Sequence, residues 1–220
     1  MHVVIAGGHG KIGLRLAALL AGRGDVVTGV VRNPDHGPDL ERAGATPAVL
    51  DLEAASADEL ATVLTGADAV VFAAGAGPGS GTARKDTVDR AAAVLLADAA
   101  RIAGVRRYLL VSSPGVDDPP APARGEVWAA YVAAKKAAEE AIQAADHLDW
   151  TILRPGSLTD DPGVGRVLLA PPPVPLGSIT RDDTAAVLVA LLDSRGSVGK
   201  VLELREGEAD VLEAVAGVSR

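Results

Sequence analysis

Short apolar runs alternate along the chain with longer stretches of helical periodicity. The runs have the length of strands and lie at residues 3–6, 26–31, 48–50, 69–73, 108–111, 151–153 and 201–204. The helical stretches lie between them, near residues 12–21, 58–64, 85–103, 127–145 and 182–192. The early strands are continuously apolar, which is typical of a sheet that helices cover on both faces. The alternation predicts an α/β fold built on a doubly wound parallel sheet.

Two long, proline-rich segments follow predicted strands. One extends from residue 112 to about 126, and the other from 154 to about 180. Both leave the carboxyl edge of the sheet, which is where ligands bind in open α/β folds. We expect one domain over residues 1–220, with substrate-side segments at about 154–180 and 195–220. A rigid surface connection is the alternative interpretation of each loop.

A glycine-rich turn joins the first predicted strand to the first predicted helix. Gly7 allows a tight turn, Gly10 lets backbone amides approach a pyrophosphate, and Gly13 lets the helix pack closely on the sheet. The helix N-terminus adds free N–H groups and a partial positive charge. We therefore predict a dinucleotide phosphate site; its members are Gly7, His9, Gly10, Lys11, Ile12 and Gly13.

The ends of the next strands indicate which dinucleotide binds. Arg32 ends the second strand, where an acidic residue would hold the ribose 2′-hydroxyl of NAD. Because a guanidinium pairs well with a phosphate, Arg32 favours NADP over NAD, unless it is only a solvated surface arginine. Asp51-Leu52 follows the third strand and is expected to flank the adenine. The small residues Ala73-Ala74-Gly75 let the dinucleotide lie close to the backbone.

A tyrosine and a lysine share one face of the predicted helix near residues 127–145. Tyr131 and Lys135 are four residues apart, and the serine pair Ser112 and Ser113 ends the preceding strand. A nearby ammonium favours the phenolate, which helps the phenol to pass a proton to a carbonyl oxygen. A serine hydroxyl can steady the same oxygen, and Lys135 can also bind the nicotinamide ribose. An exposed tyrosine beside a solvated lysine is the structural alternative.

Composition narrows the function further. The net charge is −8, and five aromatic residues are scattered over 220 residues, which argues against nucleic-acid binding. There is no cysteine and no zinc-like spacing of the four histidines, so no metal site is predicted. No apolar run reaches about 18 residues, and the chain opens on a strand-like run, so we expect no membrane segment and a cytoplasmic location. Homo-oligomer formation stays open.

The chain resembles the short-chain dehydrogenase/reductase superfamily, as an atypical, compact NAD(P)H-binding member. Beside the glycine turn, the motifs that carry the resemblance are Val31-Arg32-Asn33-Pro34, Ala73-Ala74-Gly75, Val111-Ser112-Ser113, Tyr131 with Lys135, residues 151–158 and residues 179–183. The resemblance implies a Rossmann-like fold, bound NADP and a catalytic Ser113, Tyr131 and Lys135. It also implies that Pro155-Gly156-Ser157-Leu158 lies against the nicotinamide.

The chain departs from that family at two positions. Ala6 stands where a threonine usually precedes the glycine turn, and the asparagine of the fuller catalytic tetrad has no counterpart in residues 85–103. We expect an NADP-dependent oxidoreductase that transfers hydride to a small carbonyl, quinone or flavin-like acceptor. The alternatives are a non-catalytic NADP-binding redox sensor or, ranked lower, an enzyme similar to sugar-nucleotide epimerases.

Overall fold

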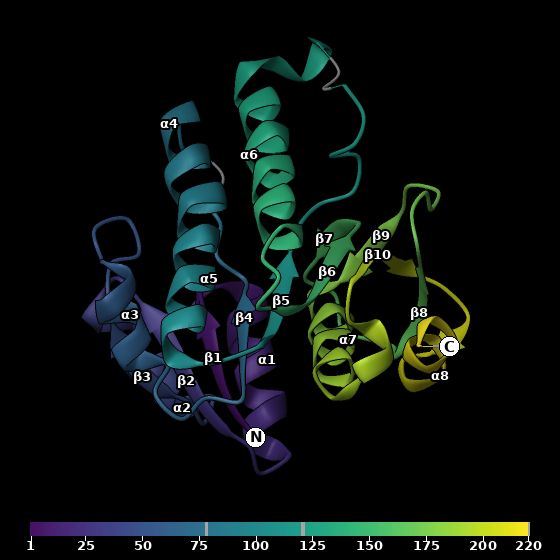
Figure 1. The fold of residues 1–220 in the computed structure, drawn as a ribbon. Helices are drawn as coiled ribbons and strands as arrows, with labels where there is room; N and C mark the ends of the chain where they lie inside the picture. The colour runs from purple at the N-terminus through teal and green to yellow at the C-terminus, as the bar shows by residue number, and fades with distance from the viewer. Residues whose placement is uncertain (78, 120–121, 220) are drawn as a thin grey trace.

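The computed structural model describes residues 1–77, 79–119 and 122–219, and it confirms the predicted α/β fold (Figure 1). Within these ranges a nine-stranded sheet has the order β11-β8-β10-β6-β5-β4-β1-β2-β3. Its strands are β1 (His2–Ala6), β2 (Val26–Val31), β3 (Thr46–Val49), β4 (Ala69–Phe72), β5 (Arg107–Val111), β6 (Asp149–Pro155), β8 (Arg166–Ala170), β10 (Lys200–Glu206) and β11 (Ala209–Asp210). The sheet is parallel except at β8, which pairs antiparallel with β10 and β11. A separate parallel pair joins β7 (Ser157–Thr159) to β9 (Ser178–Thr180).

Helices cover both faces of the sheet. Their bounds are α1 (Lys11–Gly22), α2 (Gly37–Arg42), α3 (Ala57–Val63), α4 (Thr82–Arg84), α5 (Ala92–Ala103), α6 (Gly125–Gln143), α7 (Arg181–Asp193) and α8 (Val211–Val218). A π-helical segment, Lys85–Ala91, connects α4 to α5. Short 3-10 turns occur at Pro34–His36, Pro122–Arg124 and Arg195–Ser197. Helices α1, α7 and α8 pack on one face, and α3, α5 and α6 pack on the other.

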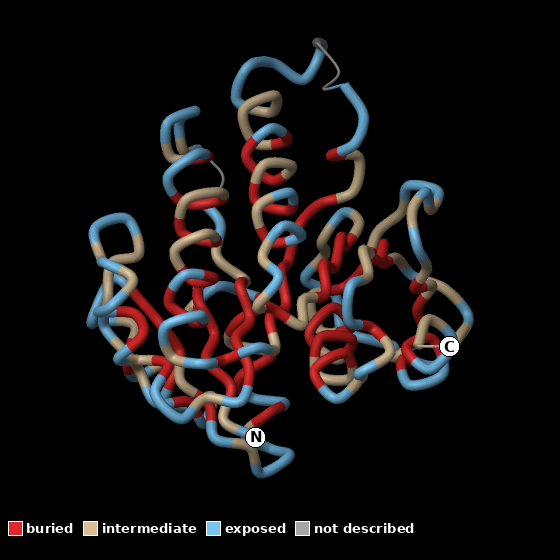
Figure 2. Tube along the Cα trace, in the orientation of Figure 1, coloured by how far each residue is buried: buried red, intermediate tan, exposed pale blue. Residues whose placement is uncertain are grey.

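The core consists of two apolar layers, one on each side of the sheet, and both are visible as buried tube in Figure 2. Strand β1 shows how the sequence builds them. Val3 and Ile5 enter one layer, while Val4 and Ala6 enter the other, and all four are fully buried. Because successive side chains of a strand point to opposite faces, a continuously apolar strand is needed to fill both layers.

The main differences from the sequence-based expectation lie in the C-terminal half. The predicted loop from 154 to about 180 contains β7, β8 and β9, and α8 was not predicted. In the N-terminal half, α2 was not predicted either. The other predicted loop ends where α6 begins, at Gly125. Its residues 120–121 lie outside the described part of the chain.

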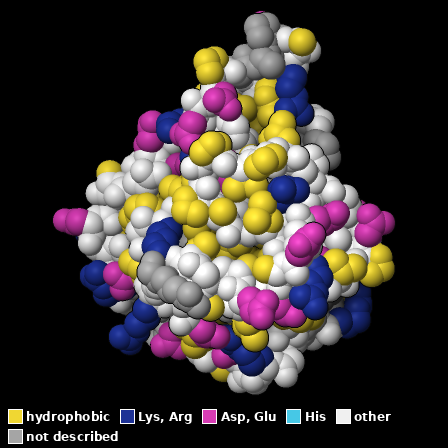
Figure 3. All heavy atoms as spheres, turned by 90° about the vertical axis from the view of Figure 1, so that its right-hand side faces the viewer, with side chains coloured by type: hydrophobic (Ala, Val, Ile, Leu, Met, Phe, Trp, Pro, Cys, Tyr) yellow, Lys and Arg dark blue, Asp and Glu magenta, His cyan; other side chains and the backbone are white. Residues whose placement is uncertain are grey.

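The surface carries mixed side chains. On the side of the molecule that Figure 3 presents, hydrophobic side chains gather near the centre, with acidic and basic ones around them. None of the helices in the described ranges is long and apolar enough to cross a membrane.

Candidate functional site

Two adjoining cavities lie at the carboxyl ends of the parallel strands. The first, of about 420 Å³, is lined by residues that follow β1, β2 and β3. The second, of about 590 Å³, is lined by residues that follow β4 and β5 and by the first half of α6. Ala74 and Gly75 line both cavities, so the two form one continuous cleft at the edge where α/β sheets bind ligands.

The glycine turn lines the first cavity through Gly7, His9 and Gly10, and Ile12, directly after it, lines the second. Gly7 has φ +86°, and a Cβ there would stand 2.7 Å from the backbone of Ala74. A Cβ on Gly13 would stand 2.4 Å from the carbonyl oxygen of Gly7. Gly10 precedes α1 and provides no side-chain cap, so the N–H groups of the first helical turn stay available. This bare backbone is suited to a phosphate, which would take the hydrogen bonds that no side chain accepts.

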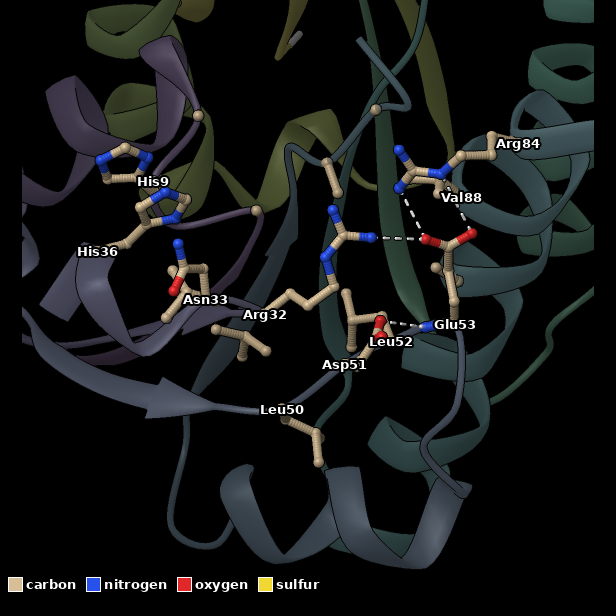
Figure 4. A pocket seen from close by; sticks show the side chains of 17 residues that line it. His9, Arg32, Asn33, His36, Leu50, Asp51, Leu52, Glu53, Arg84 and Val88 are labelled. Atoms are coloured by element: carbon tan, nitrogen blue, oxygen red, sulfur yellow. Dashed lines mark hydrogen bonds and ion pairs between the residues drawn. The ribbon is translucent and has the colours of Figure 1, made fainter. Parts of the chain in front are cut away.

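A carboxylate joins two arginines across the first cavity (Figure 4). Glu53 accepts hydrogen bonds from Arg32 at 3.0 Å, from Arg84 at 2.7 Å and from the Thr87 hydroxyl at 2.7 Å. These bonds, that of Arg84 above all, hold the pKa of the Glu53 carboxyl below its ordinary value. Arg32 is nevertheless 57 % exposed, and it uses one Nη atom for Glu53, so the rest of its guanidinium faces the open cavity.

Two imidazole rings stand at the opposite side of this cavity. His9, in the glycine turn, stacks on His36 with ring centroids 3.6 Å apart. His9 also hydrogen-bonds Asp39 at 2.7 Å, and this bond is the main cause of a lowered pKa at the Asp39 carboxyl. The first cavity therefore offers Arg32, Asn33 and His36 near the end of β2, where a nucleotide phosphate would find several nitrogen donors.

The second cavity brings together the tyrosine, the lysine and one serine. Lys135 is almost fully buried; its ammonium donates to the carbonyl oxygen of Val111 at 3.1 Å and lies 3.3 Å from Asp89. The same ammonium lies 6.0 Å from the centre of the Tyr131 ring. The hydroxyl of Ser112 is buried and has no hydrogen-bond partner. A buried hydroxyl without a partner is costly, so it is available to a ligand oxygen in this cavity.

Two further cations and an aromatic pair complete the second cavity. The ammonium of Lys85 donates to the carbonyl oxygen of Gly77 at 3.0 Å and lies 5.5 Å from the centre of the Tyr131 ring. Arg124 stacks its guanidinium 3.5 Å from the centre of the Trp128 ring. The rings of Trp128 and Tyr131 lie 5.3 Å apart and are tilted. The cavity thus combines flat apolar walls with positive charge.

The structure places the predicted site residues in three groups. The first cavity is lined by Gly7, His9, Gly10, Arg32, Asp51, Leu52, Ala74 and Gly75. The second is lined by Ile12, Ala73, Ala74, Gly75, Ser112, Tyr131, Lys135 and Leu158. The predicted residues that line neither cavity are Lys11, Gly13, Ser113, Pro155, Gly156 and Ser157.

Local contacts explain why four of these predicted residues line neither cavity. Lys11 forms an ion pair with Asp160, on the exposed side of α1. The Ser113 hydroxyl makes a long hydrogen bond of 3.4 Å to the carbonyl of Pro114. Gly156 packs so tightly that a Cβ would stand 2.3 Å from the Gly177 carbonyl oxygen. Gly13 acts through packing, because it lets α1 approach the turn.

Several residues that line the cavities were not predicted as site residues from the sequence. They are His36, Glu53, Arg84, Lys85, Asp89, Arg124 and Trp128. A weak signal existed for Lys85 and Asp89, since they are four residues apart at the start of a helical stretch and face the same side. The bond between Glu53 and Arg84 joins residues 31 apart in the chain, and nothing in the local sequence indicates it.

Comparisons with known proteins agree with this geometry. The model of a family described as NAD(P)H-binding matches residues 7–195. An uncharacterized sugar epimerase of Bacillus subtilis, YhfK, is 34 % identical over 98 % of this chain and 99 % of its own. A solved structure from Bacillus halodurans, provisionally named as an NAD-dependent epimerase/dehydratase, is 32 % identical with a TM-score of 0.90, and the match covers 99 % of both chains. ChuY of Escherichia coli O157:H7, an anaerobilin reductase, is 25 % identical with a TM-score of 0.80, over 96 % of this chain and 99 % of that one.

The family match begins at Gly7 and includes the glycine turn and the residues that line both cavities. The similarity to YhfK extends over nearly the full length of both chains. The chain therefore belongs to the family of NAD(P)H-binding proteins with a Rossmann-like fold.

Proposed function

We propose that the protein is an NADP-dependent oxidoreductase that reduces a small carbonyl, quinone or flavin-like acceptor. One observation carries the proposal above all. Tyr131, Lys135 and the unpartnered hydroxyl of Ser112 line one cavity, and this cavity adjoins the glycine turn. A proton donor thus lies beside the place where a nicotinamide dinucleotide would continue from its phosphates.

The cofactor half of the proposal rests on the first cavity. The bare backbone of the glycine turn fits the pyrophosphate, and Asp51 and Leu52 flank the space for an adenine. Arg32 supports NADP over NAD, because its outward guanidinium can pair with a 2′-phosphate, with Asn33 beside it. The position of Leu158 in the second cavity is consistent with a nicotinamide there.

A dihydronicotinamide bound in the cleft would supply the hydride. Tyr131 would donate its hydroxyl proton to the acceptor oxygen, and Ser112 would donate a hydrogen bond to the same oxygen. Lys135 is held in place by the carbonyl of Val111 and by Asp89, with its ammonium 6.0 Å from the centre of the Tyr131 ring, and it would bind the ribose of the nicotinamide. We assign the serine role to Ser112 rather than Ser113, because Ser112 is the one that lines this cavity.

The test is the oxidation of NADPH with a panel of quinones, flavins and aldehydes. We expect turnover with at least one acceptor, and a loss of at least about 10²-fold in kcat for Tyr131→Phe with NADPH affinity retained. Tight NADPH binding without turnover of any acceptor, and no effect of Tyr131→Phe, would instead indicate a redox sensor.

An epimerase is the second candidate, because two of the similar proteins carry that name. In such an enzyme the dinucleotide is reduced and reoxidised within one cycle. The two candidates differ in stoichiometry, since an epimerase would interconvert its substrate without net consumption of NADPH, whereas an oxidoreductase consumes one NADPH for each acceptor reduced.

A further inference from the structure

The charges that line the second cavity do not balance. Its described lining holds three cations, which are Lys85, Arg124 and Lys135, but a single acid, Asp89. Asp89 is buried against Lys135 at 3.3 Å, so these two form a neutral pair. Lys85 and Arg124 form no ion pair within the described part of the chain and leave the cavity with an excess of positive charge.

The positive charge of Lys85 is unusual because it is buried without an ion-pair partner among the residues that the structure describes. Its side chain is buried, with 8 % of the residue exposed, and the partner of its ammonium is the neutral carbonyl of Gly77. A buried charge is costly unless an opposite charge compensates it. The whole chain has a net charge of −8, so the positive cavity is also opposite in sign to the molecule around it. An anion in the cavity would supply the missing partner.

The anion would bind near Tyr131, away from the glycine turn that is proposed to bind the pyrophosphate. The ammonium of Lys85 lies 5.5 Å from the centre of the ring of Tyr131, the proposed proton donor. The pyrophosphate would bind elsewhere, at the backbone of the glycine turn. Arg124, the other uncompensated cation, reaches the same cavity from the start of α6. Both cations therefore face the acceptor rather than the phosphates of the dinucleotide.

The walls between these cations are flat. Trp128 and Tyr131 lie on neighbouring turns of α6 and present tilted rings 5.3 Å apart, and Val127 adds an apolar side chain that is partly exposed. Aromatic side chains arranged in this way suit a conjugated ring, which they contact over its face and edge. The cavity volume of about 590 Å³ admits a ring system of two or three fused rings.

We infer that the acceptor is a planar conjugated molecule that carries an anionic group, a carboxylate, sulfonate or phosphate, and that Lys85 and Arg124 bind this group. The inference rests on the proposed function, because it treats the second cavity as the acceptor site. It makes Lys85 and Arg124 the residues that select the substrate.

Riboflavin and flavin mononucleotide are suitable probes, because they share one ring system and differ by a phosphate. Their dissociation constants are measured by fluorescence on the protein saturated with NADP⁺. The bound NADP⁺ prevents the probes from binding at the glycine turn. We expect flavin mononucleotide to bind at least about tenfold more tightly than riboflavin. Lys85→Met should remove most of this difference, and Lys85→Arg should keep it.

Arg101→Gln is the matched control, since Arg101 is an exposed cation on α5 and lines neither cavity. The ratio of the two dissociation constants should not change in this variant. Equal binding of the two probes by the wild type would overturn the inference, and so would a tenfold ratio that survives in both Lys85→Met and Arg124→Gln.

The same samples separate this inference from the proposed function. NADPH is added in place of NADP⁺, and its oxidation by each flavin is followed. A phosphate preference without any NADPH oxidation would support the anion site and count against the oxidoreductase. Oxidation at equal kcat/KM with both flavins would support the oxidoreductase and overturn the anion site.

Discussion

At the scale of single residues, Gly13 and Gly22 of α1 allow a matched test of the glycine turn as the phosphate-binding site. A Cβ at Gly13 would stand 2.4 Å from the Gly7 carbonyl oxygen and 2.8 Å from that of Gly8. Both atoms belong to the backbone and cannot rotate away. At Gly22, in the last turn of the same helix, a Cβ would meet nothing within 4 Å.

We therefore expect opposite effects from two equivalent substitutions. Gly13→Ala should lower the free energy of unfolding by about 1–3 kcal/mol and weaken NADPH binding, because the turn must shift. Gly22→Ala should raise the stability by up to about 1 kcal/mol, because alanine restricts the unfolded chain and favours the helix. Urea unfolding and an NADPH titration of both variants measure the two effects. Unimpaired NADPH binding by Gly13→Ala would contradict the role of this turn.

The adjacent serines Ser112 and Ser113 provide the second residue-scale prediction. Ser112 lines the second cavity with a free hydroxyl, whereas Ser113 lines neither cavity. Ser112→Ala should reduce kcat by about 10-fold or more, and by a larger factor than Ser113→Ala does. Steady-state kinetics with one acceptor at saturating NADPH compare them. A larger loss in Ser113→Ala would favour the assignment that the family resemblance suggests.

At the scale of elements, a buried ion network ties α6 to the sheet beneath it. Arg154 of β6 binds both carboxylate oxygens of Glu139 in α6, at 2.6 and 2.9 Å, and it binds Asp117 in the preceding loop at 2.6 Å. Arg154 and Glu139 are buried, whereas the Asp117 side chain is 50 % exposed. The network holds in place the helix that carries Tyr131 and Lys135.

Asp117 makes this network sensitive to acid. The hydrogen bond from Arg154, together with that from Lys136, lowers the pKa of the Asp117 carboxyl to about 2. Since its pKa in the unfolded chain is about 3.9, Asp117 stabilises the fold above pH 4 and loses this effect as the pH falls towards 2. Exposure to solvent limits the contribution to about 1 kcal/mol or less.

The free energy of unfolding of Asp117→Asn should thus lie below that of the wild type at pH 7, and the two should converge between pH 4 and pH 2. Urea unfolding as a function of pH measures this. Asp98→Asn is the control, because Asp98 is exposed on α5 and forms no ion pair within the described residues. A difference for Asp117→Asn that stays constant down to pH 2 would contradict the assignment.

The elements that the sequence predicted are those with a local signal. β1, β4 and β5 are runs of mostly buried residues, β2 ends in three buried residues, and α1 repeats buried Ile12, Leu16 and Leu20 at helical spacing. The strands β7 and β9 have three residues each, too few to show a period, and they form only because they pair with each other. β8 depends on its antiparallel partner β10, more than 30 residues later in the chain. Such pairings are absent from a local pattern.

At the scale of the whole molecule, the sequence predicted where the backbone forms the site better than it predicted which charged side chains pair there. Glycines and strand ends are local features, and Gly7 and Arg32, which they indicated, line the first cavity, while Tyr131 lines the second. That these residues act on a ligand stays a prediction. The partnerships of Glu53 with Arg84 and of Asp89 with Lys135 join distant segments. Glu53 follows β3, Arg84 ends α4, Asp89 lies in the π-helical segment and Lys135 lies in α6, so only the folded chain brings these partners together. No spacing in the sequence encodes them.

The cleft spans the two halves of the fold, so a bound dinucleotide should stabilise the entire molecule. A ligand at 100 times its dissociation constant adds about 2.7 kcal/mol to the free energy of unfolding. For a chain of this length the melting temperature should rise by roughly 5–10 °C. Thermal unfolding monitored by circular dichroism, with and without NADPH, measures the shift. An unchanged melting temperature at millimolar NADPH would contradict binding in this cleft.

The central claim is that the cleft binds a nicotinamide dinucleotide by its phosphates and that Arg32 recognises the 2′-phosphate. Calorimetric titration of wild type and Arg32→Ala with NADPH and NADH tests it most directly. Arg90→Ala is the control, since Arg90 is partly exposed, is paired with Asp86 and lines neither cavity. We predict that the wild type binds NADPH at least about tenfold more tightly than NADH, and that Arg32→Ala alone loses most of this preference. A wild type that binds neither dinucleotide, or a preference that Arg32→Ala leaves unchanged, would contradict the account.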